Sequence, residues 1–121
     1  MDGSYFWHTI TAVFASWYDA KILIERAGTV STDALHVIAG VLVQLLVAML
    51  LRRPLSSWLP WLAVLAAILF NEAVDFWVER WPSLAMQLAE SAKDLVLTLL
   101  LPTVLMLALR ASPSLRAARR R

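Results

Sequence analysis

The sequence predicts an all-α integral membrane protein with three transmembrane helices and an N-terminal amphipathic helix at the membrane interface. Of its 121 residues, 60% are hydrophobic, whereas soluble domains average about 45–50%. The excess gathers in three long runs, and about 20 apolar residues are enough to cross a bilayer. Tryptophans lie at both ends of the second run, residues 57–78, as they do at membrane interfaces. The length accommodates a single membrane domain, residues 1–121.

Charge and cysteine content narrow the function further. The chain has no cysteine, which excludes disulfides, thiolate metal sites and cysteine nucleophiles. Its net charge of +2 hides an asymmetry, because most of the basic residues stand apart from the acids. These residues are Arg52, Arg53, Arg110, Arg116, Arg119, Arg120 and Arg121. Such separation indicates membrane topology and no nucleic-acid partner. By the positive-inside rule, we expect a multi-pass protein of the bacterial inner membrane with its C-terminus in the cytoplasm.

Residues 4–27 show the spacing of an amphipathic helix. Apolar side chains such as Phe6 and Trp17 recur at helical intervals, with Asp19 and Lys21 among the polar residues on the other side. We expect this helix to lie on the membrane with its aromatic rings at headgroup level. The alternative is a fourth, tilted transmembrane helix, which the charged side chains disfavour.

Three apolar segments follow, each long enough to span the membrane. They are residues 33–51, 57–78 and 91–109. Residues 82–90 read as a short amphipathic connection before the third segment, in which Pro102 predicts a kink. Residues 110–121 form a basic tail on the cytoplasmic side.

Polar residues recur near the outer end of all three predicted spans. The set comprises Asp33, His36, Asn71, Glu72, Asp75, Lys93, Asp94 and Thr98. Within each span their three- and four-residue spacing places them on one face of a helix. An acid near the centre of a bilayer costs about 2.5–3.5 kcal/mol on insertion scales. We therefore expect these faces to meet one another rather than lipid.

Three short motifs in this layer resemble those of the VanZ-like and YjdF-like small bacterial inner-membrane proteins. Residues 33–40 carry a D-x-x-H-x-x-x-G pattern, residues 72–77 an acid pair followed by aromatics, and residues 93–98 a Lys-Asp-Leu segment with a threonine. The resemblance implies an envelope-associated membrane protein, and one branch of that group is linked to glycopeptide-antibiotic tolerance.

The polar layer has several candidate ligands: a lipid headgroup, a cation or a partner helix. A divalent cation such as Zn²⁺, Mn²⁺ or Mg²⁺ would use His36, Glu72, Asp75 and Asp94, since imidazole and carboxylate groups suit these ions. A catalytic alternative uses His36 or Glu72 as general base. No established catalytic spacing accompanies them, so the sequence favours a non-enzymatic protein.

Two further interpretations need no ligand at all. In the first, the polar residues serve only to hold the helices together, because interhelical polar contacts stabilise membrane proteins by about 0.6 kcal/mol on average. Alternatively, the chain is an accessory subunit that stabilises a larger membrane complex or a homo-oligomer. Six tryptophans and the flat N-terminal helix favour packing against such partners.

Overall fold

Four helices make up the fold, and the structure, a computed structural model, describes residues 3–28, 30–112 and 114. The helices are α1 (Gly3–Ala27), α2 (Thr32–Leu50), α3 (Trp58–Val78) and α4 (Leu84–Ala111). Three of them, α2, α3 and α4, are long and apolar enough to cross a membrane. The predicted all-α membrane fold is therefore confirmed, whereas most of the predicted tail, residues 110–121, lies outside the described residues.

Serine caps begin each of the three apolar helices. The hydroxyl of Ser31 accepts a hydrogen bond from the backbone N–H of Ala34 at 3.2 Å, and Ser57 and Ser83 cap α3 and α4 in the same way. Each cap satisfies one of the backbone donors that a helix leaves open in its first turn. The start of every apolar helix is therefore fixed by a local signal.

The fourth helix is longer than predicted. Residues 84–90, expected to form a separate amphipathic connection, are instead the first two turns of α4. They consist of strong helix formers and contain neither glycine nor proline, so nothing interrupts the helix before the apolar stretch. At about 1.5 Å per residue, α4 is about 42 Å long and exceeds the roughly 30 Å hydrocarbon core.

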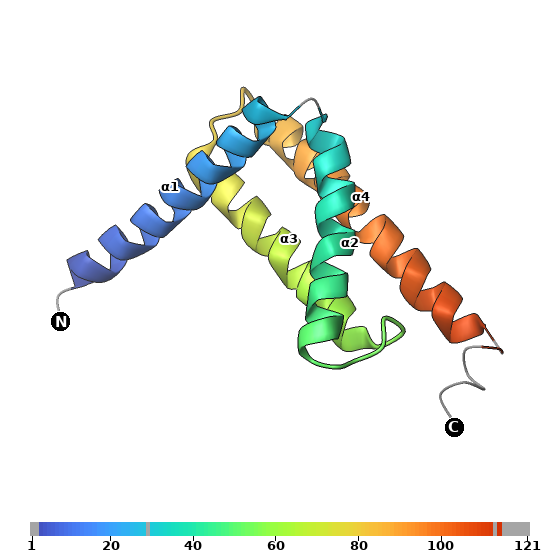
Figure 1. Ribbon diagram of the computed structural model, residues 1–121. Coiled ribbons are helices and arrows are strands. Elements are labelled where there is room, and N and C mark those ends of the chain that lie inside the picture. The colour runs from blue at the N-terminus through green and yellow to red at the C-terminus, as the bar shows by residue number, and fades with distance from the viewer. Residues whose placement is uncertain (1–2, 29, 113, 115–121) are drawn as a thin grey trace.

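The helices run alternately up and down, so the connections gather at two opposite ends (Figure 1). We call the end with connections 28–31 and 79–83 the pocket end. The other end, with connection 51–57 and the last turn of α4, is the arginine end. In this arrangement α2 and α4 run parallel to each other and α3 runs antiparallel to both.

A repeated contact joins α2 to α4 along their length. His36 faces Asp94, a Cβ on Gly40 would meet the backbone of Thr98, and Gln44 donates a hydrogen bond to the carbonyl of Pro102 at 3.1 Å. Each partner lies 58 positions further along the chain, as expected for two parallel helices in register. Glycine allows the backbones to approach closely at the middle of this seam.

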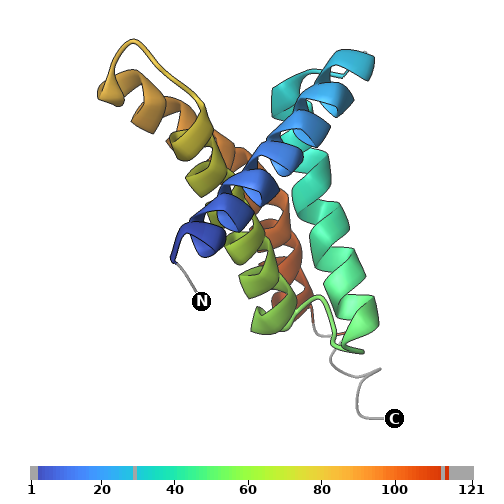
Figure 2. The ribbon, with the colours of Figure 1, turned by 90° about the vertical axis from the view of Figure 1, so that its left-hand side faces the viewer.

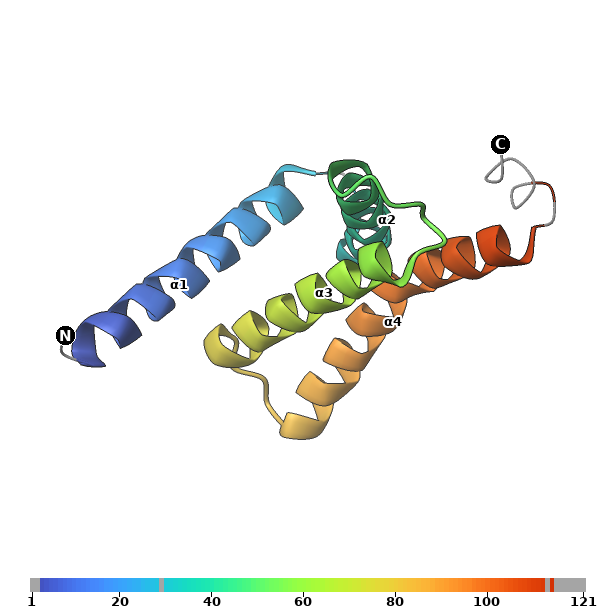
Figure 3. The ribbon, with the colours of Figure 1, turned by 90° about the horizontal axis from the view of Figure 1, so that it is seen from below.

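Pro102 lies within this seam, and α4 continues through it. Because proline has no N–H, the carbonyl of Thr98 loses its usual partner in the helix. That carbonyl is the group packed against Gly40. Figure 3 shows the axis of α4 changing direction near the middle of the helix, in agreement with the predicted kink.

The first helix packs mainly against α3, through part of its length. Phe14 and Trp17 make edge-on contacts with Phe70, with ring centroids 5.7 and 6.2 Å apart. Figure 2 shows α1 crossing α3 obliquely, and Figure 1 shows its N-terminal half extending away from the other helices. Of the described residues in α1, none is buried. The interfacial position of this helix stays a prediction.

Candidate functional site

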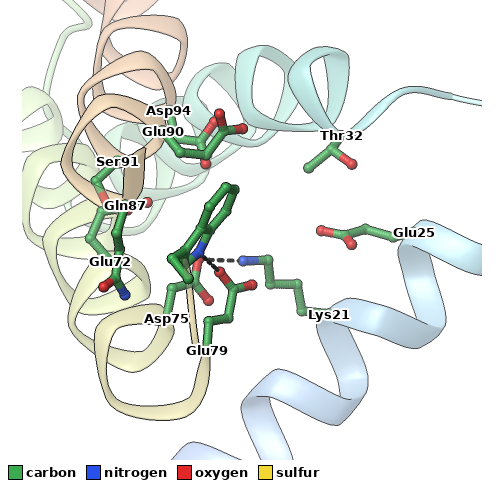
Figure 4. A pocket seen from close by; sticks show the side chains of 11 residues that line it. Lys21, Glu25, Thr32, Glu72, Asp75, Glu79, Gln87, Glu90, Ser91 and Asp94 are labelled. Atoms are coloured by element: carbon green, nitrogen blue, oxygen red, sulfur yellow. Dashed lines mark hydrogen bonds and ion pairs between the residues drawn. The ribbon is translucent and has the colours of Figure 1, made fainter. Parts of the chain in front are cut away.

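A small polar pocket lies at the pocket end, with a volume of about 100 Å³. All four helices and the connection between α3 and α4 contribute to it. Its lining consists of Lys21, Glu25, Thr32, Glu72, Asp75, Glu79, Trp81, Gln87, Glu90, Ser91 and Asp94. Figure 4 shows their carboxylates converging from several elements. Six acids face a single lysine in this lining, so the pocket carries a strong excess of negative charge.

Helix α3 contributes the buried Glu72 and Asp75 to the pocket, with Asn71 beside them, and each of the three is at most 8% exposed. The Asn71 amide donates hydrogen bonds to Asp75 Oδ2 at 3.2 Å and to Glu72 Oε1 at 3.3 Å. Asp75 shares a helix face with both of the others, because it is three positions from Glu72 and four from Asn71. The sequence predicted this grouping.

Helix α1 contributes two residues that the sequence did not place in the cluster. Trp17 donates its indole N–H to Asn71 at 3.2 Å, and the Lys21 ammonium lies 2.5 Å from Asp75 Oδ2. Burial lowers the pKa of Lys21, but the hydrogen bond and charge of Asp75 outweigh it and raise the net pKa above 10.5. Lys21 is therefore a fixed cation beside the acids.

A signal for this contact was present in the sequence. Trp17 and Lys21 are four positions apart, as are Asn71 and Asp75. When two helices run parallel, as α1 and α3 do, residues with the same spacing can pair one to one, Trp17 with Asn71 and Lys21 with Asp75. Without knowledge of which helix neighbours α1, however, this match could not be distinguished from an ordinary polar face.

Beside the pocket, α2 and α4 bring together the His36 imidazole, which does not line the cavity, and the Asp94 carboxylate, which does. His36 Nδ1 lies 3.5 Å from Asp94 Oδ1, and neither atom has a hydrogen-bond partner among the described residues. Asp94 is 6% exposed. This separation exceeds the 2.7–3.2 Å of a normal N–H···O hydrogen bond. Two buried polar atoms are thus directed at each other without bonding.

Lys93 and Asp33 lie on the rim rather than inside. The Lys93 ammonium is 2.5 Å from Glu90 Oε1 and 3.0 Å from Asp33 Oδ1, and its side chain is 42% exposed. Lys93 pairs with these two acids because it lies beside the Asp94 face of α4 and its side chain turns toward the start of α2.

Thr98 is also separate from the pocket. It lies one turn below Asp94, where its backbone packs against Gly40 and its hydroxyl has no partner among the described residues. It shares a helix face with Asp94, as predicted, but it does not line the cavity. Its position indicates a role in helix packing.

The geometry selects a smaller set of metal ligands than the sequence suggested. One ligand atom each from His36, Glu72 and Asp94 lies within 4.8 Å of the other two. Asp75, the fourth predicted ligand, belongs to the Lys21 ion pair instead. A second group, Asp33, Glu90 and Asp94, has similar spacing, but Lys93 already neutralises its first two members.

No protein-family model matches this chain, and no curated protein or solved structure matches it significantly. The resemblance of residues 33–98 to the VanZ-like and YjdF-like proteins stays a prediction.

Proposed function

We propose that this multi-pass membrane protein binds a divalent cation at the edge of its polar pocket, through Glu72 and Asp94 of the lining and the adjacent His36. The separation of 3.5 Å between His36 Nδ1 and Asp94 Oδ1 carries the proposal. Two ligands of a tetrahedral ion with bonds of about 2.0–2.1 Å lie about 3.4 Å apart. The two atoms therefore have the spacing of neighbours in one coordination shell, and both need a partner.

The size and charge of the pocket favour an ion over the other candidate ligands. Pockets for organic ligands occupy about 300–1,000 Å³, whereas this one is about 100 Å³. A water molecule takes up about 30 Å³ in the liquid, so the cavity holds an ion with a few waters but not a lipid headgroup. A cation also relieves the repulsion among its carboxylates.

The donor set indicates which cations fit. One imidazole nitrogen with two carboxylates suits Zn²⁺ or Mn²⁺, whereas Ca²⁺ prefers six to eight oxygen ligands. Three protein ligands leave one position of a tetrahedral ion for water. We expect Zn²⁺ to bind most tightly, followed by Mn²⁺, as the general order of divalent affinities predicts.

The membrane placement is part of the same proposal. Arg52 and Arg53 lie at the arginine end, which the positive-inside rule assigns to the cytoplasm. The pocket end then faces the outside of a bacterial inner membrane, where a cation enters without crossing the bilayer. This is the topology expected of an envelope protein.

Calorimetry on the purified protein in lipid nanodiscs tests cation binding. Titration with Zn²⁺ should show one site, and Glu72→Gln should weaken it at least tenfold because a ligand is lost. Glu79→Gln is the matched control, since Glu79 lines the pocket but lies outside the ligand group. An equal loss in both variants would mean that only the overall charge matters, and absence of binding in the unaltered protein would overturn the proposal.

A second candidate, an accessory subunit of a larger complex, is favoured by one observation. The N-terminal half of α1 extends away from the other helices, and Tyr5, Phe6 and Trp7 on it are between 57% and 70% exposed. A partner protein would cover these rings. Native mass spectrometry from a mild detergent separates the candidates: a stoichiometric protein partner supports the subunit, and a monomer that retains metal supports the cation site.

A further inference from the structure

The arginine end contains an open groove of about 1100 Å³ that the cation site does not involve. It lies between the connection from α2 to α3, the first turn of α3 and the last turn of α4, at the lower end of the bundle in Figure 1. Its size is at the scale of sites for organic ligands. The groove and the pocket are at opposite ends of the spans.

The lining of this groove is both basic and apolar. Arg52, Arg53 and Arg110 border it together with leucines such as Leu59 and Leu62, and no acid is among its lining residues in the described chain. A ligand that matches this surface must carry negative charge at one end and hydrocarbon at the other. An anionic phospholipid has both.

Arg52 occupies an unusual backbone position at the edge of the groove. Its φ of 50° is left-handed, the only positive φ among the described non-glycine residues. The backbone N–H of Arg53 bonds to Ala48 and that of Arg52 to Met49, which is the Schellman pattern at a helix end. Glycine normally occupies this position because it has no Cβ. An arginine there is a backbone outlier, and such outliers cluster at functional sites.

Arg110 gives the opposite wall of the groove a fixed shape. Its Nε donates to the carbonyl of Ser56 at 2.6 Å, and its guanidinium lies 4.7 Å from the centre of the Trp58 ring. These contacts join the end of α4 to the connection between α2 and α3. Among the described residues, no carboxylate pairs with Arg52 or Arg53 across from this wall.

We propose that the groove binds one anionic phospholipid. Arg52 and Arg53 contact its phosphate, and an acyl chain lies along Leu59 and Leu62, which face the level of the hydrocarbon. Basic pockets between transmembrane helices on the cytoplasmic side have this preference for anionic headgroups. The site would anchor the protein in register with the inner leaflet, and it is independent of cation binding at the pocket end.

Native mass spectrometry tests the site on the full chain released from nanodiscs of phosphatidylglycerol and phosphatidylcholine. The unaltered protein should retain one phosphatidylglycerol in preference to phosphatidylcholine. Arg52→Gly and Arg53→Gln should each lower that retention about fivefold, the effect of one basic residue near a lipid surface. Arg80→Gln is the matched control, because it removes the same charge from the connection at the pocket end.

Arg52→Gly separates lipid binding from folding. Glycine relieves the left-handed backbone, so this variant should unfold no more easily than the unaltered protein while it loses the lipid. Equal retention of both lipids, or an equal loss in Arg80→Gln, would overturn the site. Inorganic phosphate that displaces the lipid at millimolar concentration would show a simple anion site and would also overturn it.

Discussion

Lys21 and His36 divide the acids of the pocket into two groups. Asp75 is neutralised by the ammonium of Lys21 at 2.5 Å, whereas Asp94 faces an imidazole at 3.5 Å without a bond. Glu72 accepts a hydrogen bond from the Asn71 amide. Because Lys21 pairs with Asp75, this acid is not a metal ligand. The remaining triad of His36, Glu72 and Asp94 has a charge suited to a divalent ion.

The Lys21–Asp75 ion pair should set the pH range in which α1 is docked on α3. The pKa of Lys21 is raised above 10.5, so the pair stabilises docking at lower pH and loses this effect as pH rises through the raised pKa. A distance between spin labels on α1 and α3 should stay constant from neutral pH to about 10 and lengthen above that. The chain has no cysteine to interfere with labelling.

Replacing the lysine provides the control for that measurement. Lys21→Gln should lengthen the distance already at neutral pH, since a hydrogen bond to a charged group contributes about 1.5–3 kcal/mol. In Lys21→Gln, the distance between the labels on α1 and α3 should then show no step as the pH rises above about 10. A step that persists in Lys21→Gln would assign the titration to another group and contradict this role.

At the scale of elements, the seam between α2 and α4 holds both sites in place. Gly40 brings the two backbones together, and Gln44 bonds to the carbonyl of Pro102. His36 and Asp94 lie one helical turn closer to the pocket end than Gly40 and Thr98. The distance between them therefore depends on how closely α2 and α4 approach each other. A small residue and a proline thus determine the geometry of the proposed cation ligands.

Gly40→Ala should destabilise the protein and weaken Zn²⁺ binding together. The added Cβ would lie 3.0 Å from the carbonyl carbon of Thr98 and closer still to its oxygen, so the helices must separate. Overpacking of this kind costs about 1–3 kcal/mol, measurable by unfolding in detergent. Gly3→Ala is the control, because nothing lies within 4 Å of a Cβ there. Unchanged stability in Gly40→Ala would contradict the seam.

The sequence predicted the elements well where local signals exist. Apolar runs, serine caps and the residues beside proline set the helix limits to within a few positions, and they did so for α2 and α3. The start of α4 was missed because a helix that leaves the membrane keeps its backbone pattern while its side chains become polar. The depth of a residue in the membrane and its secondary structure are separate properties, so polar side chains do not mark the end of a helix.

For the whole molecule, the polar layer was predictable but its internal pairing was not. Burial in an apolar run identifies which residues must meet. Which of these residues pair depends on the rotation of each helix about its axis and on which helix lies next to α1. No local sequence pattern predicts either property. This is why Glu72 and Asp94 were expected in the cluster, whereas Lys21 was not.

The separation of basic and acidic ends predicts the orientation of the molecule. A reporter protein that is active only in the cytoplasm should be active when fused after Arg121, since the arginine end faces inward. A fusion within connection 79–83 should be inactive. The opposite pattern would place the pocket in the cytoplasm and contradict an envelope role.

The proposed cation site depends most on His36, which supplies an imidazole ligand beside two carboxylates. X-ray absorption at the zinc edge tests it most directly on the Zn²⁺-loaded protein in nanodiscs. The spectrum should show one imidazole nitrogen at about 2.0–2.1 Å with carboxylate oxygens. His36→Ala should abolish the imidazole signal, and His8→Ala, which alters the exposed second histidine, should leave it intact. An imidazole signal that survives in His36→Ala would contradict the proposed site.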